Sequence, residues 1–214
     1  MIVRAAFLLA ASALLGGCVS FEVAPVAETG CDATLAGRWE QVLSPDGDAD
    51  RKDRSISVNA DCALEERAED GSVALHPFRT FEFEGHQYIA MPASSDDDEI
   101  KTVVDSNGRV IETWPRDRVE LYRYRHDGDR ILIWAMQTEV AIAVRSDGAV
   151  AHSDATIDAE TGKPIPGIFP DNVYLSGSRD ALAALLRTQG DALYGNMQDK
   201  GARAFARIHT RDSK

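Results

Sequence analysis

The sequence lacks the residue patterns that mark the common catalytic sites. Its five histidines form neither an HxH nor an HExxH pattern, and no Gly-x-Ser-x-Gly motif is present. Gly162-Lys163 has no glycine at the position that a phosphate-binding loop requires. We therefore expect a protein without enzymatic activity. A hydrolase whose catalytic residues come from separate strands stays open as an alternative.

Metal-binding patterns are also missing. Asp46, Asp48 and Asp50 have the spacing of the first ligands of a calcium loop, but Arg51 and Ser57 stand where that loop needs Gly and Glu. No His lies at ligand spacing from either Cys31 or Cys62. The sequence therefore predicts no metal ion and no other cofactor.

Basic residues are in the minority. The chain has 23 Lys and Arg against 35 Asp and Glu, and its formal net charge is −12 at pH 7. A negative field of this size repels nucleic acid and anionic lipid head groups. We therefore exclude a nucleic-acid partner.

The one long apolar run, Ala5–Leu15, is too short for a permanent membrane span of ~20 residues. It follows Arg4 and precedes Gly16 and Gly17, which is the layout of an export signal. Leu15-Gly16-Gly17-Cys18 resembles the lipobox of bacterial lipoproteins. The resemblance implies that residues 1–17 are cleaved and that Cys18 carries a lipid anchor in a membrane. Because Val19 rather than Asp follows the cysteine, the resemblance further implies the periplasmic face of the outer membrane.

Cysteine is scarce, with three residues in the chain. If Cys18 is lipidated, Cys31 and Cys62 remain, and in an oxidising compartment we expect them to pair as a disulfide. A catalytic thiol or a metal-binding pair is the alternative. A disulfide here would close a loop of ~30 residues, worth ~3–4 kcal/mol.

We expect residues 18–30 to be a lipidated tether and residues 31–214 a single β-rich domain. Short alternating runs separated by turn dipeptides predict an antiparallel meander that begins with a strand at Leu35–Val42. Ser178 predicts the start of one helix, whose apolar face carries Leu182 and Leu185 and which ends at Gly190. Three hairpins are expected, at Ser106-Asn107-Gly108, Asp127-Gly128-Asp129 and Ser146-Asp147-Gly148, the last with Val140–Val144 as one of its strands.

Gly37-Arg38-Trp39 resembles the Gly-x-Trp motif on the first strand of lipocalins, within the calycin group. The resemblance implies a lipocalin-like barrel, with the C-terminal helix packed on it. It also implies a structural motif of Gly37 and Trp39, in which Trp39 is buried at one end of the barrel against a basic residue from a late strand. Arg207, on an expected strand at Ala202–His209, is the candidate for that basic residue.

Tyr122-Arg123-Tyr124-Arg125 has strict alternation, which places both tyrosines on one face of a strand and both arginines on the other. Arg123 and Arg125 could form a patch for an anionic ligand or a partner. Phe81-Glu82-Phe83-Glu84 has the same alternation with the opposite charge, so the two strands could instead have complementary outer faces.

These expectations combine into an outer-membrane lipoprotein that faces the periplasm and has no enzymatic activity. A small apolar or amphipathic molecule bound in the barrel is the first expected ligand. The alternatives are an accessory lipoprotein that binds a protein partner in the cell envelope, and the hydrolase named above.

Overall fold

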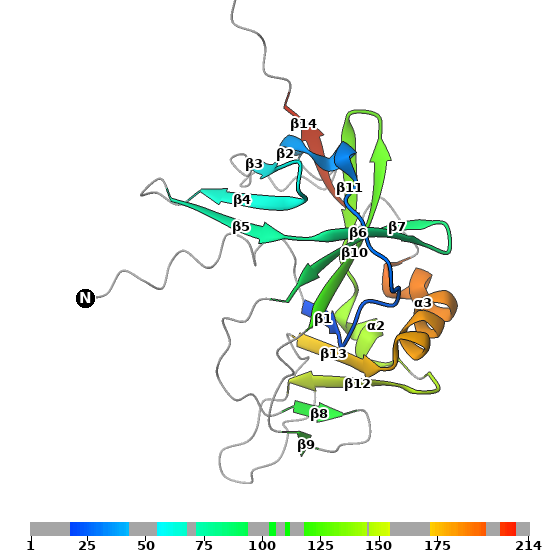
Figure 1. Cartoon of the computed structure of the whole chain (residues 1–214). Helices are drawn as coiled ribbons and strands as arrows, with labels where there is room; N and C mark the ends of the chain where they lie inside the picture. Colours follow the sequence, from blue (N-terminus) through cyan, green and yellow to red (C-terminus); the bar gives the residue numbers. More distant parts are fainter. Residues whose placement is uncertain are drawn as a thin grey trace, which may run out of the picture.

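The computed structural model describes residues 18–42, 55–67, 72–93, 103–105, 110–111, 118–144, 146–154, 172–195 and 202–208. Within these ranges the chain is mainly β, and fourteen strands belong to one hydrogen-bonded sheet (Figure 1). The strands are β1 (Cys18–Phe21), β2 (Gly37–Val42), β3 (Ser55–Val58), β4 (Ala63–Arg67), β5 (Val73–Pro77), β6 (Arg79–Phe83), β7 (His86–Pro92), β8 (Val103–Asp105), β9 (Val110–Ile111), β10 (Val119–Asp127), β11 (Arg130–Trp134), β12 (Ala149–Asp154), β13 (Asn172–Gly177) and β14 (Arg203–Arg207). The helices are η1 (Ala33–Leu35), α2 (Thr138–Ile142) and α3 (Arg179–Leu193).

The expected barrel is wrong, because the sheet is open. Its strands follow the order β5-β4-β3-β2-β14-β11-β10-β1-β13-β12-β8-β9, with β7 on β10 and β6 on β7. One long strand, β10, causes the branching: it pairs with β1 at Val119 and Glu120 and with β11 from Arg123 to Asp127. The sheet therefore divides into two arms at β10. Most pairs are antiparallel, but β1 and β13 run parallel.

The expected tether at residues 18–30 is also wrong, because its first residues form a central strand. β1 lies between β10 and β13, and Val19 and Phe21 are buried. Gly30 then forms a two-way backbone bridge with Thr80 of β6. In β1, the alternation of Val19, Ser20 and Phe21 has the period of a strand, but a segment this short cannot be distinguished from a loop by its sequence pattern. The folded domain therefore begins with β1 and not near Cys31.

Two of the three expected hairpins are confirmed by strand pairing. Asp127-Gly128-Asp129 joins β10 to β11, with Asp127 paired to Arg130. The structure has a further hairpin between β6 and β7, where Glu84 and Gly85 both have positive φ, as in a type I′ turn. β8 and β9 pair antiparallel on either side of Ser106-Asn107-Gly108, a turn that lies outside the described residues.

Val140–Val144 does not form the expected strand, since α2 covers Thr138–Ile142. Gln137 O accepts hydrogen bonds from the amides of Val140 and Ala141, which start a helical turn. A short run that is apolar on both faces fits a buried helix as well as a buried strand. Gly148 still forms a turn before β12, with φ of 78°.

The C-terminal helix α3 begins as expected, with Ser178 Oγ accepting from the amide of Ala181. Leu182, Leu185 and Leu186 are buried on its inner face. The predicted end at Gly190 is wrong, because the helix continues through that residue to Leu193. Gly190 has a packing role instead, which is described with Arg123 below.

Two clusters of buried side chains lie on opposite faces of β10, since Leu121 belongs to one and Tyr122 to the other. The first core joins the sheet to α2 and α3. Its larger members include Phe21, Tyr88, Leu121, Trp134, Leu175, Leu182, Leu185, Leu193 and Tyr194. The second core packs on one face of the arm that runs through β2, β11 and β14. It consists of Leu35, Trp39, Cys62, Phe78, Ile89, Tyr122, Tyr124, Ile131 and Phe205.

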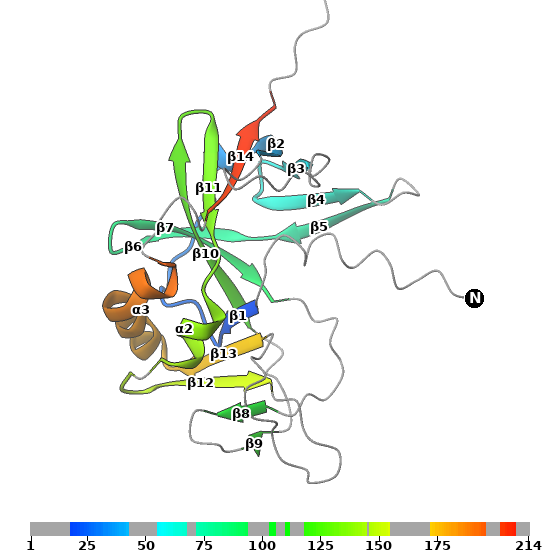
Figure 2. The ribbon, with the colours of Figure 1, turned by 180° about the vertical axis from the view of Figure 1, so that it is seen from behind.

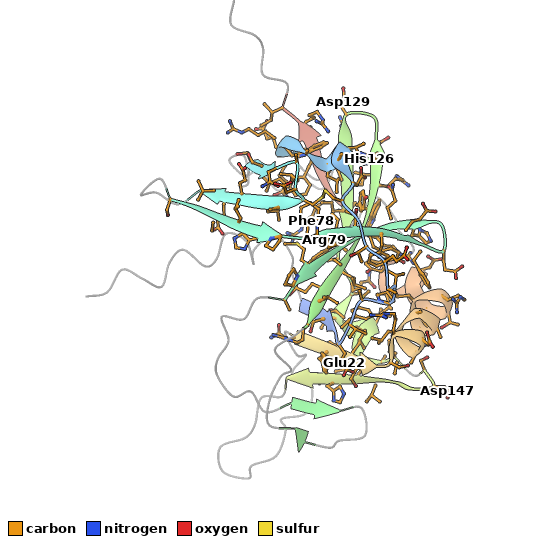
Figure 3. All side chains as sticks on the ribbon, viewed as in Figure 1. Glu22, Phe78, Arg79, His126, Asp129 and Asp147 are labelled. Atoms are coloured by element: carbon orange, nitrogen blue, oxygen red, sulfur yellow. A yellow bond between two sulfur atoms is a disulfide. The ribbon has the colours of Figure 1, made fainter. Side chains whose placement is uncertain are left out.

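β5 and β6 are joined through the single residue Phe78, which is buried in the second core near the middle of the molecule (Figure 3). β5 pairs with β4 on one side of Phe78, and β6 pairs with β7 on the other. The β4–β5 hairpin consequently extends away from the body of the molecule, as both views of the ribbon show (Figures 1 and 2).

Candidate functional site

Trp39 is buried as expected, with 2% of its surface exposed. Its indole Nε1 donates to Leu35 O at 2.8 Å, which ties η1 to β2. Arg207 of β14 pairs directly with Trp39, and its guanidinium carbon lies 4.4 Å from the ring centroid. The same guanidinium donates to Ala36 O at 3.0 Å and Thr34 O at 2.6 Å. The predicted pairing of Trp39 with a basic residue from a late strand is therefore confirmed, although the sheet is open.

Gly37 is required at this place for a steric reason. Its φ is 139°, and a Cβ there would lie 2.9 Å from Nη1 of Arg207. The structural motif of Gly37 and Trp39 thus closes one end of the second core with a stacked and hydrogen-bonded guanidinium.

A polar cluster around Asp32 lies next to this end. Asp32 Oδ1 accepts from the amide of Thr34 at 2.9 Å and from its hydroxyl, and Oδ2 accepts from Tyr124 Oη at 2.9 Å. His126 Nε2 lies 2.9 Å from Thr34 Oγ1 and 3.4 Å from Asp32 Oδ2. In Figure 3, His126 lies on the part of β10 that is remote from α3.

The pKa values of this cluster follow from burial and hydrogen bonding. Burial alone would raise the pKa of Asp32, but the hydrogen bonds from Thr34, Tyr124 and His126 together hold it below its ordinary value. Burial, followed by the hydrogen bond to Asp32, raises the pKa of Tyr124. Thr34 donates its proton to Asp32, so His126 Nε2 must be the donor to Thr34. A catalytic base would instead accept the proton of the hydroxyl, so the direction of this hydrogen bond is the opposite of the catalytic one. The cluster serves as the N-cap of η1.

The disulfide between Cys31 and Cys62 is confirmed, with a Cα–Cα distance of 5.7 Å and a sequence separation of 31 residues. It joins the segment before η1 to the residue before β4. Cys62 is fully buried in the second core.

The arginine patch is wrong for Arg123, which is 2% exposed. The alternation itself is confirmed, because Tyr122 and Tyr124 lie in the second core while Arg123 faces α3. Arg123 Nε donates to Tyr88 Oη at 2.8 Å and Nη1 to Asp191 Oδ1 at 2.7 Å. Its guanidinium carbon also lies 4.7 Å from the Tyr194 ring centroid.

Gly190 makes room for this buried guanidinium, since a Cβ there would lie 2.5 Å from Arg123 Nη2. The hydrogen bond from Arg123 lowers the pKa of Asp191, although some burial opposes it. The pKa of His86, whose Nε2 is 3.6 Å from Asp191 Oδ1, is lowered mainly by burial and then by the charge of Arg123. Arg123 therefore binds α3 to β10 and is not available to a ligand.

Arg125 is exposed, and its guanidinium carbon lies 5.5 Å from the Trp134 ring centroid. The expected complement from Phe81–Glu84 does not form, because β6 pairs with β7 and not with β10. Glu84 binds Arg187 of α3 at 2.7 Å instead. Arg123 and Arg125 thus share a face of β10 but do not form a common patch.

A histidine and a serine come together on β12 and β13, which the sequence did not reveal. His152 Nε2 lies 2.7 Å from Ser176 Oγ, and the His152 ring lies 5.5 Å from that of the buried Tyr174. Burial, with the nearby carboxylate of Glu22, raises the pKa of Tyr174 to about 12. The amide of Gly177 already donates to Glu22 Oε2 at 2.9 Å. This amide is therefore not free to donate to a developing oxyanion.

The largest departure from ordinary burial lies on the β4–β5 hairpin, which the sequence did not single out either. Among the described residues, Val73 and Leu75 of β5 are the large apolar side chains that remain exposed, at 45% and 56%. They are two residues apart and therefore share one face of the strand. The signal in the sequence is Val73-Ala74-Leu75, two residues after the dipeptide Asp70-Gly71 that is typical of turns, and it indicates a strand but not its burial.

The remaining predicted features give little more. Asp46, Asp48 and Asp50 lie outside the described residues. In the described part of the chain, no group of three or more His, Cys, Asp or Glu side chains is placed to hold a metal ion. No helix in those same ranges has both the length and the apolar character that crossing a bilayer would need.

Comparison of the sequence with protein-family models and with curated proteins, and of the fold with solved structures, gives no match.

Proposed function

We propose that this protein is a lipid-anchored accessory protein of the cell envelope, without enzymatic activity, that acts by binding a protein partner. The lipobox-like segment ending at Cys18 supports the anchor, and the resemblance favours the periplasmic face of the outer membrane. The observation that carries partner binding is the distribution of apolar side chains. They pack against one another inside both cores, whereas Val73 and Leu75 lie on the outside of an extended hairpin.

The same distribution weakens the case for a carrier of a small apolar molecule. A carrier of the lipocalin kind needs an apolar cavity inside its sheet. The positions that would line one here, including Trp39, Tyr122 and Phe205, are buried in contact with each other in the second core. We therefore place partner binding before ligand binding.

The anchor is tested by growing the producing cells with radiolabelled palmitate. Label should enter the wild-type protein and be absent from Cys18→Ser, with Cys31→Ser as the control that keeps its label. Label in the Cys18→Ser protein would contradict the anchor. Partner binding is tested separately, by photo-crosslinking the full chain in cells from exposed positions on several elements.

We expect one discrete adduct with an envelope protein from at least one face. Native mass spectrometry of the purified protein tests the alternative of a bound small molecule. A small apolar molecule bound at one copy per chain, with no adduct from any position, would favour the carrier and overturn this proposal.

A further inference from the structure

β5 is an edge strand with an unusual degree of exposure. Among the described residues it pairs only with β4, and it stands at one end of the strand order. All its residues except His76 are exposed. Edge strands in native proteins are normally short, charged or covered, because their free amides and carbonyls attract other strands. Val73-Ala74-Leu75 contains no charged residue of the kind that protects most edge strands.

The two faces of the hairpin differ in character. Leu75 is paired with Glu65 of β4 and Val73 with Arg67, so these four residues share one face of the hairpin. Glu65 is exposed, and no ion-pair partner for it is found in the described ranges. On the opposite face, Glu66 is already bound to His76 Nε2 at 2.9 Å. One face therefore carries two aliphatic side chains together with Glu65 and Arg67, and on the other face the carboxylate of Glu66 is already paired.

We propose that the edge of β5 binds an extended segment of the partner protein as an added strand. In this mode main-chain hydrogen bonds provide affinity, and alternate side chains provide specificity. The segment has aliphatic residues at alternate positions, which cover Val73 and Leu75, and a Lys or Arg that meets Glu65. Pro77 has no amide hydrogen and ends the strand, so the paired stretch extends from β5's start to His76. This inference rests on the proposed partner binding and specifies its site.

Charge favours such a partner over the other occupants of an exposed apolar edge. A second copy of the chain would bring the same formal net charge of −12 to the interface. An anionic bilayer would be repelled by the same net charge. A basic, aliphatic segment in extended conformation satisfies the carboxylate and both apolar side chains at once.

The test places a photoreactive phenylalanine analogue at position 75 of the full chain in the producing cells. A matched control carries it at position 192, where Ala192 is exposed on α3. We expect an adduct from position 75 whose mapped partner peptide has alternating aliphatic residues and a basic residue. Leu75 is replaced by the probe, so Val73→Lys is the blocking variant, and it should lower the yield at least tenfold. Glu65→Lys should lower it several-fold, and Ala192→Lys should not change it.

Unchanged thermal unfolding of each variant shows that the loss is not caused by misfolding, since all these side chains are exposed. Adducts from position 192 or other faces, with none from position 75, would overturn the β5 site and leave partner binding intact. An adduct at position 75 with a second copy of the chain or with lipid would also overturn it. The absence of adducts from every position would overturn both proposals.

Discussion

The guanidinium of Arg207 covers the buried ring of Trp39 and at the same time donates to two carbonyls of the segment around η1. One end of the second core is therefore closed by a single side chain from the last described strand. Truncation of a buried Trp typically costs ~3–5 kcal/mol. We expect Trp39→Ala to lower the free energy of unfolding by about this amount, measured by urea unfolding of a soluble form that starts at residue 18 with Cys18→Ser.

The matched variant is Arg207→Lys, which keeps the charge but loses the fork that reaches both carbonyls. Its loss should be smaller than that of Trp39→Ala. A Trp39→Ala protein that unfolds at the wild-type urea concentration would contradict the role of Trp39 as a closing residue.

The disulfide should contribute to stability through the unfolded chain. It joins residues separated by 31 positions, and the chain-entropy model gives ~3–4 kcal/mol for a loop of this size. We expect the double variant Cys31→Ser and Cys62→Ser to lose about that much, by urea unfolding without reductant. Wild type in the presence of dithiothreitol is the control and should show a similar loss. Equal stability of oxidised and reduced wild type would exclude a structural role for the bond.

Gly190→Ala should destabilise the protein, against the usual trend. An alanine normally stabilises a helix interior by ~1 kcal/mol relative to glycine. Here the added Cβ would lie 2.5 Å from Arg123 Nη2, and that guanidinium is held by Tyr88 and Asp191. In the background of Arg123→Met, which removes the guanidinium, the same Gly190→Ala change should be neutral or stabilising. Thermal melts of the four proteins give the coupling directly, and additive effects would disprove the contact.

Asp191 should make part of the stability depend on pH. Its folded-state pKa is lowered below the ordinary 3.8 by the hydrogen bond from Arg123. Its stabilising contribution is therefore complete above the unfolded pKa and is lost as the pH falls through the folded value. Asp191→Asn should cost ~1 kcal/mol or less at neutral pH, because the carboxylate is 69% exposed and solvent screens its attraction to the buried guanidinium.

The difference between wild type and Asp191→Asn should then shrink below pH 3.8. Asp147→Asn, in the exposed turn before β12, is the control, with little effect at either pH. Denaturant unfolding at a series of pH values provides the measurement. A difference that grows towards acid would mean that the sign of the interaction is wrong.

Ser176 should not react as a catalytic nucleophile, despite its distance of 2.7 Å from His152. The neighbouring amide of Gly177 is bound to Glu22 and offers no donor to a developing oxyanion. We expect a fluorophosphonate probe to leave Ser176 unlabelled in the native protein, as judged by peptide mapping. Labelling that disappears in His152→Ala but persists in Ser178→Ala would instead establish the hydrolase alternative.

Local chemistry was readable from the sequence, and long-range placement was not. The cap at Ser178 and the turn at Asp127-Gly128-Asp129 depend on neighbouring residues, so their identities were sufficient. Val140–Val144 and Gly190 were misread for the opposite reason. Val140–Ile142 is helical because Ala141 packs into the first core. Gly190 lies inside a helix and not at its end, because the guanidinium of Arg123 leaves no room for a Cβ there.

The same distinction applies to the candidate sites. Alternation correctly assigned Tyr122 and Arg123 to opposite faces, but it could not show that α3 covers the arginine face. The exposure of Val73 and Leu75 depends on β5 being an edge strand, which is a property of the whole strand order. Neither fact is encoded within the segment concerned.

The parallel pairing of β1 with β13 has a consequence for the order of folding. Gly177 of β13 donates to Glu22, which directly follows β1, across a separation of 155 residues. Contacts that close such long loops slow folding, because the entropy of closure is lost before the contacts form. During synthesis from the N-terminus, Val19 and Phe21 therefore lack their β13 neighbours until that strand has been made. Apolar residues that stay exposed during such a delay are sites at which an incompletely folded chain aggregates or binds a chaperone.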